Sequence, residues 1–176
     1  MSNLRLINET TTVAGVQSVN ITDVFTSDFD IYVIMSSNLM ANNSTATGAN
    51  MRLIDSFGNV AVDSVHDYGQ EAHKGETSKG TNQSSTETRF WNTFGGIDDG
   101  GQGAGSTIWM YHPYNNKHTM LTWRSVGQPG GQLRGYNGIG IYPTYRRFTG
   151  FQAELNESAG EFAVGGKIRT YGLRVD

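Results

Sequence analysis

Cysteine is absent from this chain of 176 residues, and charged side chains are scarce. The lack of cysteine excludes disulfides, thiolate zinc sites, iron–sulfur clusters and cysteine nucleophiles. Asp, Glu, Lys and Arg make up 16% of the chain, and the formal net charge is −3. Affinity for a phosphate backbone comes from clustered Lys and Arg, so we expect no nucleic-acid partner.

Long apolar runs are missing as well. No stretch approaches the ~20 apolar residues that a membrane-spanning helix requires, so we expect no membrane partner. Near the N-terminus, Asn8 and Glu9 interrupt the first apolar residues before they reach the length of a secretory signal. These features predict a soluble protein without a secretory signal.

Glycine and aromatic residues are abundant: there are 23 glycines, and Phe, Trp and Tyr form 11% of the chain. Few charges combined with many Gly, Thr, Tyr and Phe residues are typical of a turn-rich β protein. The segment Phe29–Met35 places apolar side chains on both faces of a strand, which predicts a central strand covered on each side. No window shows the apolar spacing of an amphipathic helix.

Short apolar segments recur between Gly, Asn, Asp and Pro residues. We expect a hairpin around Gly58, between the runs 50–55 and 60–65. The other strand candidates are 16–25, 86–94, 106–111, 118–125, 136–142, 149–155 and 167–175. Many short strands without intervening helices predict an all-β fold, an antiparallel β-sandwich of the jelly-roll type. We expect a single domain over residues 1–176 with a short N-terminal arm over residues 1–15.

Three segments are expected to be long loops. Residues 66–87 are polar, residues 95–105 are more than half glycine, and residues 127–135 are also rich in glycine. Loops longer than ~12–15 residues are uncommon in compact domains and tend to be functional or disordered. The first loop is therefore either a partner contact or an inert surface insertion.

No pattern of catalytic or metal-binding residues stands out. The acidic turn Asp98-Asp99-Gly100 could offer carboxylates to calcium, but it lacks the ligand series of a calcium loop. There is no P-loop and no nucleophile elbow. The histidines lack the spacing that aims two imidazoles at one metal: they are His66, His73, His112 and His118. We expect no enzyme activity, no catalytic residue, no cofactor and no metal site.

Aromatic residues in the strand candidates allow two interpretations. Trp91, Trp109 and Trp123 could be flat platforms for sugar rings, but large aromatics within strands normally fill the space between sheets. We therefore assign them to core or subunit packing. Among these aromatics and the neighbouring tyrosines, we expect Tyr114 to be exposed, because it lies in a turn that contains Pro113. The candidate surface contacts are Asp98, Asp99, Tyr114 and Asn115.

Both ends of the chain resemble a known group of proteins. The segments Met1–Glu9 and Val19–Tyr32, and later Thr149–Gln152 and Gly166–Arg174, are similar to small virion structural proteins of tailed bacteriophages, especially marine cyanophages. The strand candidate Ile108–Pro113 is also loosely similar to a segment of these virion proteins. The resemblance implies a jelly-roll module, often trimeric, that is attached to the capsid or the tail. It implies no catalytic residues.

These observations predict a non-enzymatic bacteriophage virion structural protein on the particle surface, as a capsid decoration or cement protein or as a small tail-attached module. Its expected location is the virion. Its expected partners are copies of itself, in a homotrimer, and other capsid or tail proteins. Exposed strand edges favour assembly because closed symmetry hides them. The alternative is a tail-tip module that binds a host receptor or surface glycan, and an enzyme such as a glycan depolymerase ranks last.

Overall fold

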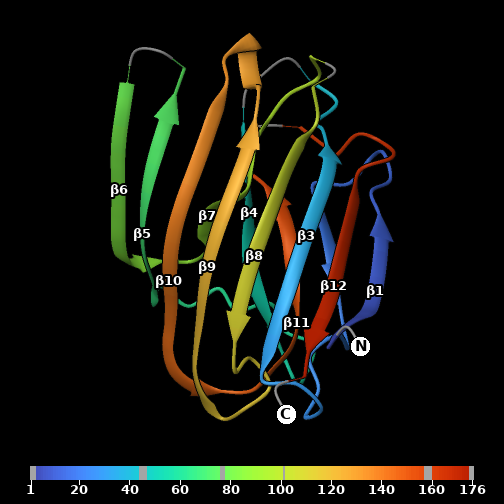
Figure 1. Cartoon of the computed structure of the whole chain (residues 1–176), viewed down its shortest axis with the longest axis vertical. Coiled ribbons are helices and arrows are strands. Elements are labelled where there is room, and N and C mark those ends of the chain that lie inside the picture. The colour runs from blue at the N-terminus through green and yellow to red at the C-terminus, as the bar shows by residue number, and fades with distance from the viewer. Residues whose placement is uncertain (1–2, 44–46, 76–77, 101, 157–159, 175–176) are drawn as a thin grey trace.

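The computed structural model describes residues 3–43, 47–75, 78–100, 102–156 and 160–174. Within these ranges, twelve strands form two antiparallel sheets that pack face to face (Figure 1). The described helical structure is one 3-10 turn at Pro129–Gly131, and no helix there has the length or apolar character to cross a membrane. The predicted all-β sandwich is therefore confirmed.

The larger sheet has eight strands and the smaller sheet has four. In spatial order, the larger sheet consists of β1 (Leu4–Thr11), β12 (Lys167–Leu173), β3 (Ile31–Leu39), β8 (Ala104–Tyr111), β9 (Lys117–Gly127), β10 (Arg134–Arg146), β5 (His66–Lys74) and β6 (Ser78–Glu87). The smaller sheet consists of β2 (Ser18–Ile21), β11 (Phe148–Leu155), β4 (Thr47–Asp55) and β7 (Phe90–Ile97).

The order of the strands is jelly-roll-like. The successive strands β1 and β2, β3 and β4, β7 and β8, and β11 and β12 alternate between the two sheets. Two hairpins, β5–β6 and β9–β10, add four strands to the larger sheet beyond β8. The larger sheet is therefore wide, and the hairpins form the left-hand part of it in Figure 1.

Aromatic side chains dominate the core between the sheets. Tyr32 and Ile34 of β3 are fully buried on its inner face. The ring of Phe25 meets the Tyr32 ring edge-on at 4.8 Å and stacks on Phe151 at 6.0 Å. Such pairs contribute packing energy beyond the apolar area that they bury.

Trp123 of β9 fills the core beneath β10. It is 2% exposed, and the ring of Tyr68 lies 6.4 Å from it. Gly138 of β10 is directly opposite Trp123, and a Cβ atom at position 138 would lie 2.1 Å from the indole ring. The glycine is required here because the ring occupies the space of a side chain.

The segment 66–87 is not the loop that the sequence predicted. It forms the hairpin β5–β6, in which β5 pairs with β10 from Arg134 to Ile141 and β6 is the edge strand. The polar composition of 66–87 hid these strands, since a strand with polar side chains on both faces has no apolar alternation. Backbone pairing to β10 places the hairpin in the sheet, and one face of β5 is then buried at Tyr68 and Ala72.

Two smaller predictions are also corrected. The expected N-terminal arm is instead the edge strand β1, which pairs with β12. The expected hairpin around Gly58 is present only in part, because no strand forms over 60–65. Val60 makes a single bridge to Ile54, while Gly58 has the positive φ of 82° that the turn requires.

Candidate binding face

The outer face of the larger sheet, which points away from the smaller sheet, is open in the described part of the chain (Figure 1). In β9, Leu121 and Trp123 are buried on the inner face, whereas Met120 and Arg124 are exposed on the outer face. The sequence predicted that β3 is covered on both faces. That prediction holds for Val33, which is 1% exposed, but not for Met35 on the same outer side of β3, which is 37% exposed.

Strand register aligns the outer side chains in rows that cross the sheet. Directly paired residues project from the same face, and neighbouring strands lie ~4.8 Å apart. The first row, called the Trp109 row, is Leu6, Tyr171, Val33, Trp109, Thr122, Ile139, Gly69 and Gln83. The second row, called the Asn137 row, is Glu9, Arg169, Met35, Thr107, Arg124, Asn137, Glu71 and Thr81.

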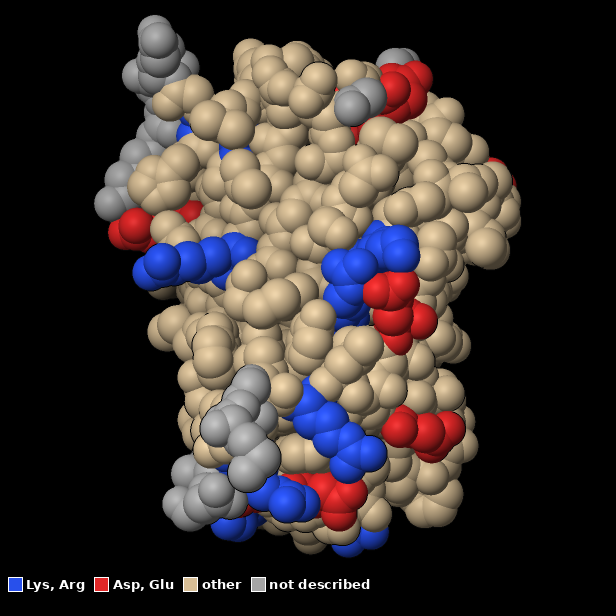
Figure 2. All heavy atoms as spheres, turned by 45° about the vertical axis from the view of Figure 1, so that its right-hand side comes forward, with Lys and Arg blue, Asp and Glu red and all other residues tan. Residues whose placement is uncertain are grey.

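The part of this face over β1, β12 and β3 is apolar. We call it the apolar band, and it consists of Leu6, Ile31, Val33, Met35, Tyr171 and Leu173. Met35 is exposed, Ile31, Tyr171 and Leu173 are half-buried, and Val33 is buried. Leu6 is 51% exposed. Beside the band, Glu9 accepts hydrogen bonds from Lys167 at 2.7 Å and Arg169 at 2.5 Å, and these bonds lower the pKa of Glu9. On the side of the molecule in Figure 2, charged side chains lie in small groups separated by uncharged surface.

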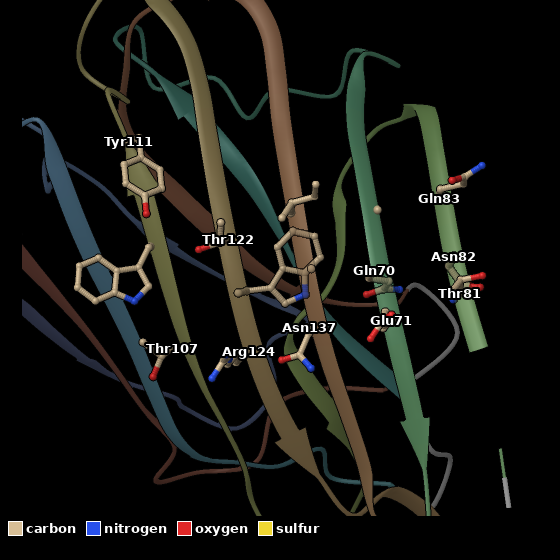
Figure 3. Close-up of a pocket in the computed structure, with 15 residues that line it drawn as sticks. Gln70, Glu71, Thr81, Asn82, Gln83, Thr107, Tyr111, Thr122, Arg124 and Asn137 are labelled. Atoms are coloured by element: carbon tan, nitrogen blue, oxygen red, sulfur yellow. The ribbon is translucent and has the colours of Figure 1, made fainter. Parts of the chain in front are cut away.

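A groove of about 1170 Å³ lies over β8, β9, β10, β5 and β6 on the same face (Figure 3). In Figure 3, Arg124 and Asn137 project from adjacent strands, and Thr81 and Gln83 lie beyond them on β6. The groove is lined by parts of both rows: Trp109, Thr122, Ile139, Gly69 and Gln83 from one, and Thr107, Arg124, Asn137, Glu71 and Thr81 from the other.

Gly69 of β5 leaves open space in this groove between Ile139 and Gln83. A Cβ atom at position 69 would meet no other atom within 4 Å, so a larger side chain at this position would extend into the groove without a steric clash at its Cβ atom. A second hollow of about 480 Å³ adjoins the groove and includes Tyr111 and Met120. The outer face is therefore hollowed across several strands.

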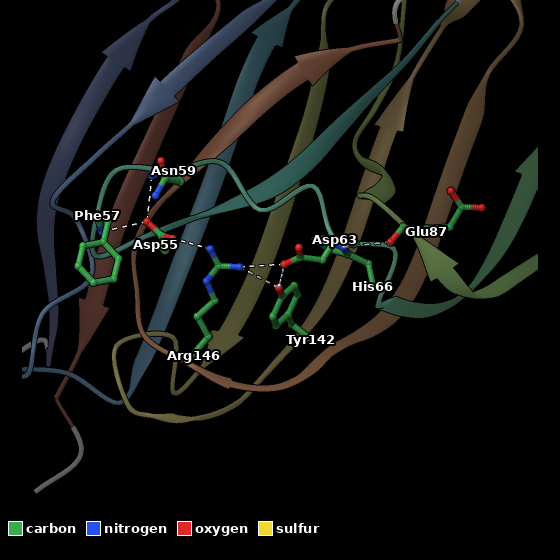
Figure 4. Close-up of polar contacts among 8 residues, drawn as sticks. All are labelled: Asp55, Phe57, Asn59, Asp63, His66, Glu87, Tyr142 and Arg146. Atoms are coloured by element: carbon green, nitrogen blue, oxygen red, sulfur yellow. Dashed lines mark hydrogen bonds and ion pairs between the residues drawn. The ribbon is translucent and has the colours of Figure 1, made fainter.

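A polar network at the end of β10 joins Arg146 and Tyr142 to two aspartates (Figure 4). Arg146 donates to Asp55 at 2.5 Å and to Asp63 at 2.8 Å, and Tyr142 donates to the same oxygen of Asp63 at 2.6 Å. Burial by itself would raise the pKa of Asp55. The hydrogen bonds from Arg146 and from two backbone N–H groups of the following turn have the larger effect, so the pKa of Asp55 lies below its usual value. Burial and the bond to Asp63 raise the pKa of Tyr142. The network ties the connection between β4 and β5 to β10, which is a structural role.

His66 is fully buried next to this network. Its Nδ1 lies 3.2 Å from the carbonyl oxygen of Asp63 and 3.1 Å from that of Glu87, so we assign the ring proton to Nδ1. The rings of Phe90 and Tyr142 meet the imidazole edge-on at 4.8 and 5.0 Å. Burial lowers the pKa of His66, which favours the neutral imidazole.

The described residues contain no group of three or more His, Cys, Asp or Glu side chains that could hold a metal ion. The other histidines lie in separate places. His73 lies 3.8 Å from Glu71, His112 lies 3.6 Å from Asp30, and His118 packs against a tyrosine ring. These positions do not bring the imidazoles together.

The predicted surface contacts lie at two distant places. Asp98, after β7, is only 5% exposed, and its carboxylate accepts hydrogen bonds from the N–H groups of Gly100 and Gly130. Asp98 therefore fixes the turn, and its burial does not fit an exposed contact. Asp99 beside it is exposed.

Tyr114 and Asn115 lie beyond the other end of β8. Eight strand residues separate the two ends by about 23 Å. Tyr114 is half-buried beneath the guanidinium of Arg147, 4.8 Å from the ring centre, and Asn115 donates to Asp30 at 2.8 Å. The four predicted residues therefore do not form one site.

The groove was missed at the sequence level. Trp123 is buried as expected, but Trp109 points to the outer face and is 39% exposed, so it does not pack in the core of the chain. Its neighbours Ile108 and Met110 are fully buried. Because side chains alternate along a strand, burying both neighbours turns Trp109 outward, and this signal was available in the sequence.

A scan against models of protein families gives no match for the chain, and a search of curated proteins finds no relative.

Proposed function

We propose that the chain is a non-enzymatic structural protein of a bacteriophage particle, held at the surface of the capsid or tail. We further propose that it assembles with copies of itself, as a trimer, through the apolar band. The observation that supports the assembly most strongly is this band, where apolar side chains of three neighbouring strands face outward. The sequence resemblance supports the phage particle as the location.

The band has the chemistry of a contact between proteins. Leu6 and Tyr171 are direct neighbours in register, so the apolar surface continues from β1 to β12. On β3, Val33 is buried beside Tyr171 and Met35 is the exposed member of the band. Contiguous exposed apolar patches are uncommon on soluble monomers and mark contact sites. The adjacent Glu9 is paired within the chain, so a partner needs no complementary charge there. Around a three-fold axis, the bands of three copies can converge, so each copy meets apolar surface on the next.

The edge strand β1 gives a second reason for assembly. It carries Leu6 of the apolar band and, among the residues that the structure describes, it pairs with a strand on only one side, β12. On its other side, the N–H and C=O groups of the backbone can pair with a strand of another chain. A closed symmetric oligomer can bury such an edge and so prevent uncontrolled pairing. Burial of the band and this edge in one interface would satisfy both requirements.

Sedimentation equilibrium tests the assembly. The wild type should sediment as a trimer of about 58 kDa, three times the chain mass of 19.2 kDa. Leu6→Glu should shift the protein toward the monomer, because a charge in the interface would be desolvated. Val164→Glu is the matched control, since Val164 is 65% exposed and lies outside the band. A monomeric wild type at micromolar concentration would contradict the proposed assembly.

Mass spectrometry of purified particles, together with antibody labelling in electron micrographs, tests the location. The chain should copurify with particles at a fixed ratio to the major capsid protein and be accessible to antibody on intact particles. Its absence from particles purified from infected cells would refute the proposed location, whatever the oligomeric state.

A further inference from the structure

We propose that the groove binds an uncharged glycan chain, which lies across β8, β9, β10, β5 and β6 with one sugar ring on the indole of Trp109. The site goes beyond the proposed function because it uses a different part of the outer face from the apolar band. Each can therefore exist without the other.

The Asn137 row supplies the polar contacts. Five successive strands each present one side chain that can donate or accept a hydrogen bond: Thr107, Arg124, Asn137, Glu71 and Thr81. At the strand spacing of ~4.8 Å, the row extends for ~19 Å. A glycan chain carries hydroxyl groups at regular intervals, and each hydroxyl both donates and accepts. A row of mixed donors and acceptors matches that pattern.

Trp109 supplies the apolar contact at one end of the groove. Its side chain is 39% exposed, and its direct neighbour on β9 is Thr122. A sugar ring has an apolar face of C–H groups and a rim of hydroxyls, so it can stack on an indole while a nearby threonine bonds the rim. Further along the same row, Ile139 offers a second apolar contact and Gly69 leaves room for the chain.

The charges in the groove favour an uncharged ligand. Arg124 and Glu71 are on either side of Asn137 in register, so the two formal charges offset each other. Grooves for single-stranded nucleic acid carry a surplus of positive charge along their length, which this groove lacks. A charged polymer would therefore meet attraction at one position and repulsion at the other.

The position of the groove argues against a peptide. Extended peptides commonly bind at the edge of a sheet, where free backbone groups can form new hydrogen bonds. The groove crosses β8, β9, β10 and β5, which have strands on each side, and it runs across the edge strand β6 rather than along it. Its polar lining also differs from the apolar centre of a subunit interface. A ligand must therefore be held by side chains, as a glycan is.

Affinity electrophoresis against a panel of neutral soluble polysaccharides tests the site. Dextran, pullulan, galactomannan and hydroxyethylcellulose in the gel are the probes, and titration of tryptophan fluorescence measures affinity for those that retard the protein. The wild type should be retarded by at least one. Trp109→Ala should weaken that binding at least tenfold. Gly69→Leu should do the same by filling the groove, without a clash at its Cβ atom.

Gly80→Leu is the matched control. Gly80 is in the same hairpin, also has open space around its Cβ position, and pairs with Ala72 of the inner face. This variant should bind as the wild type does, and circular dichroism should show that all variants are folded. Failure of every polysaccharide to retard the wild type would overturn the proposed site. So would folded Trp109→Ala and Gly69→Leu proteins that bind with unchanged affinity.

The two proposals fail in distinguishable ways. A trimer that binds no polysaccharide would overturn only the glycan site. A monomer that binds through Trp109 would overturn only the assembly. Leu6→Glu should still bind the polysaccharide, because Leu6 lies on β1, outside the groove.

Discussion

Replacement of Gly138 by alanine should strongly destabilise the fold, because the position has no room for a methyl group. The new Cβ atom would lie 2.1 Å from Cζ2 and 2.2 Å from Cε2 of Trp123. Non-bonded carbon atoms normally stay ~3.5–4.0 Å apart, so the indole would have to move by about 1.5 Å. Trp123 is 2% exposed in a packed core, so the move displaces other side chains.

The expected cost of Gly138→Ala is about 3 kcal/mol, at the upper end of the usual range for overpacking, because an indole is rigid. For a domain of this size, 1 kcal/mol corresponds to about 2–4 °C, so Tm should fall by about 6–12 °C. Thermal unfolding followed by circular dichroism measures the shift. Gly80→Ala is the control and should stay within about 0.5 kcal/mol of the wild type, since its Cβ atom meets nothing within 4 Å. A Gly138→Ala protein as stable as this control would refute the packing of Trp123 against β10.

Three further predictions concern the buried polar groups. Because burial lowers the pKa of His66, the unfolded chain takes up a proton at this residue at a higher pH than the folded chain does. The free energy of unfolding should therefore fall as the pH drops below about 6.5. Urea titrations should find a smaller fall for His66→Asn. Arg146→Met should cost about 2 kcal/mol in chemical unfolding because it leaves Asp55 buried without its cation; a change under about 0.5 kcal/mol would contradict that role. Tyr142→Phe, measured in the same way, should cost about 1 kcal/mol because it removes the hydrogen bonds of the hydroxyl to Asp63 and Arg146. Equal stability would show that these bonds are dispensable.

Much of the fold could be predicted from the sequence, because buried strands leave an alternating apolar pattern. Residues 106–111 and 118–125 were predicted as strands, and they lie in β8 and β9. The hairpin β5–β6 could not be found in this way. Tyr68 and Ala72 of β5 are buried, but the residues between them are polar or glycine, and the pattern reads as a loop. Pairing with the distant strand β10 decides its structure.

The candidate site was harder to predict than the fold. The outward direction of Trp109 follows from the alternation of β8 and was within reach of sequence reasoning. Its neighbourhood was not, because the row that joins Trp109 to Thr122, Ile139 and Gln83 depends on the register of strands far apart in the chain. Residues such as Asp98 attracted attention through local composition, yet their backbone contacts show that they stabilise a turn.

Thiol labelling tests most directly whether the apolar band is the assembly interface. The chain has no cysteine, so Leu6→Cys and Val164→Cys each introduce a single thiol. Both parent side chains are more than half exposed in the isolated chain, at 51% and 65%. At concentrations where the protein is a trimer, maleimide should label Val164→Cys rapidly and Leu6→Cys slowly, and dilution to the monomer should remove the difference. Equal labelling rates in the assembled protein would contradict a buried apolar band.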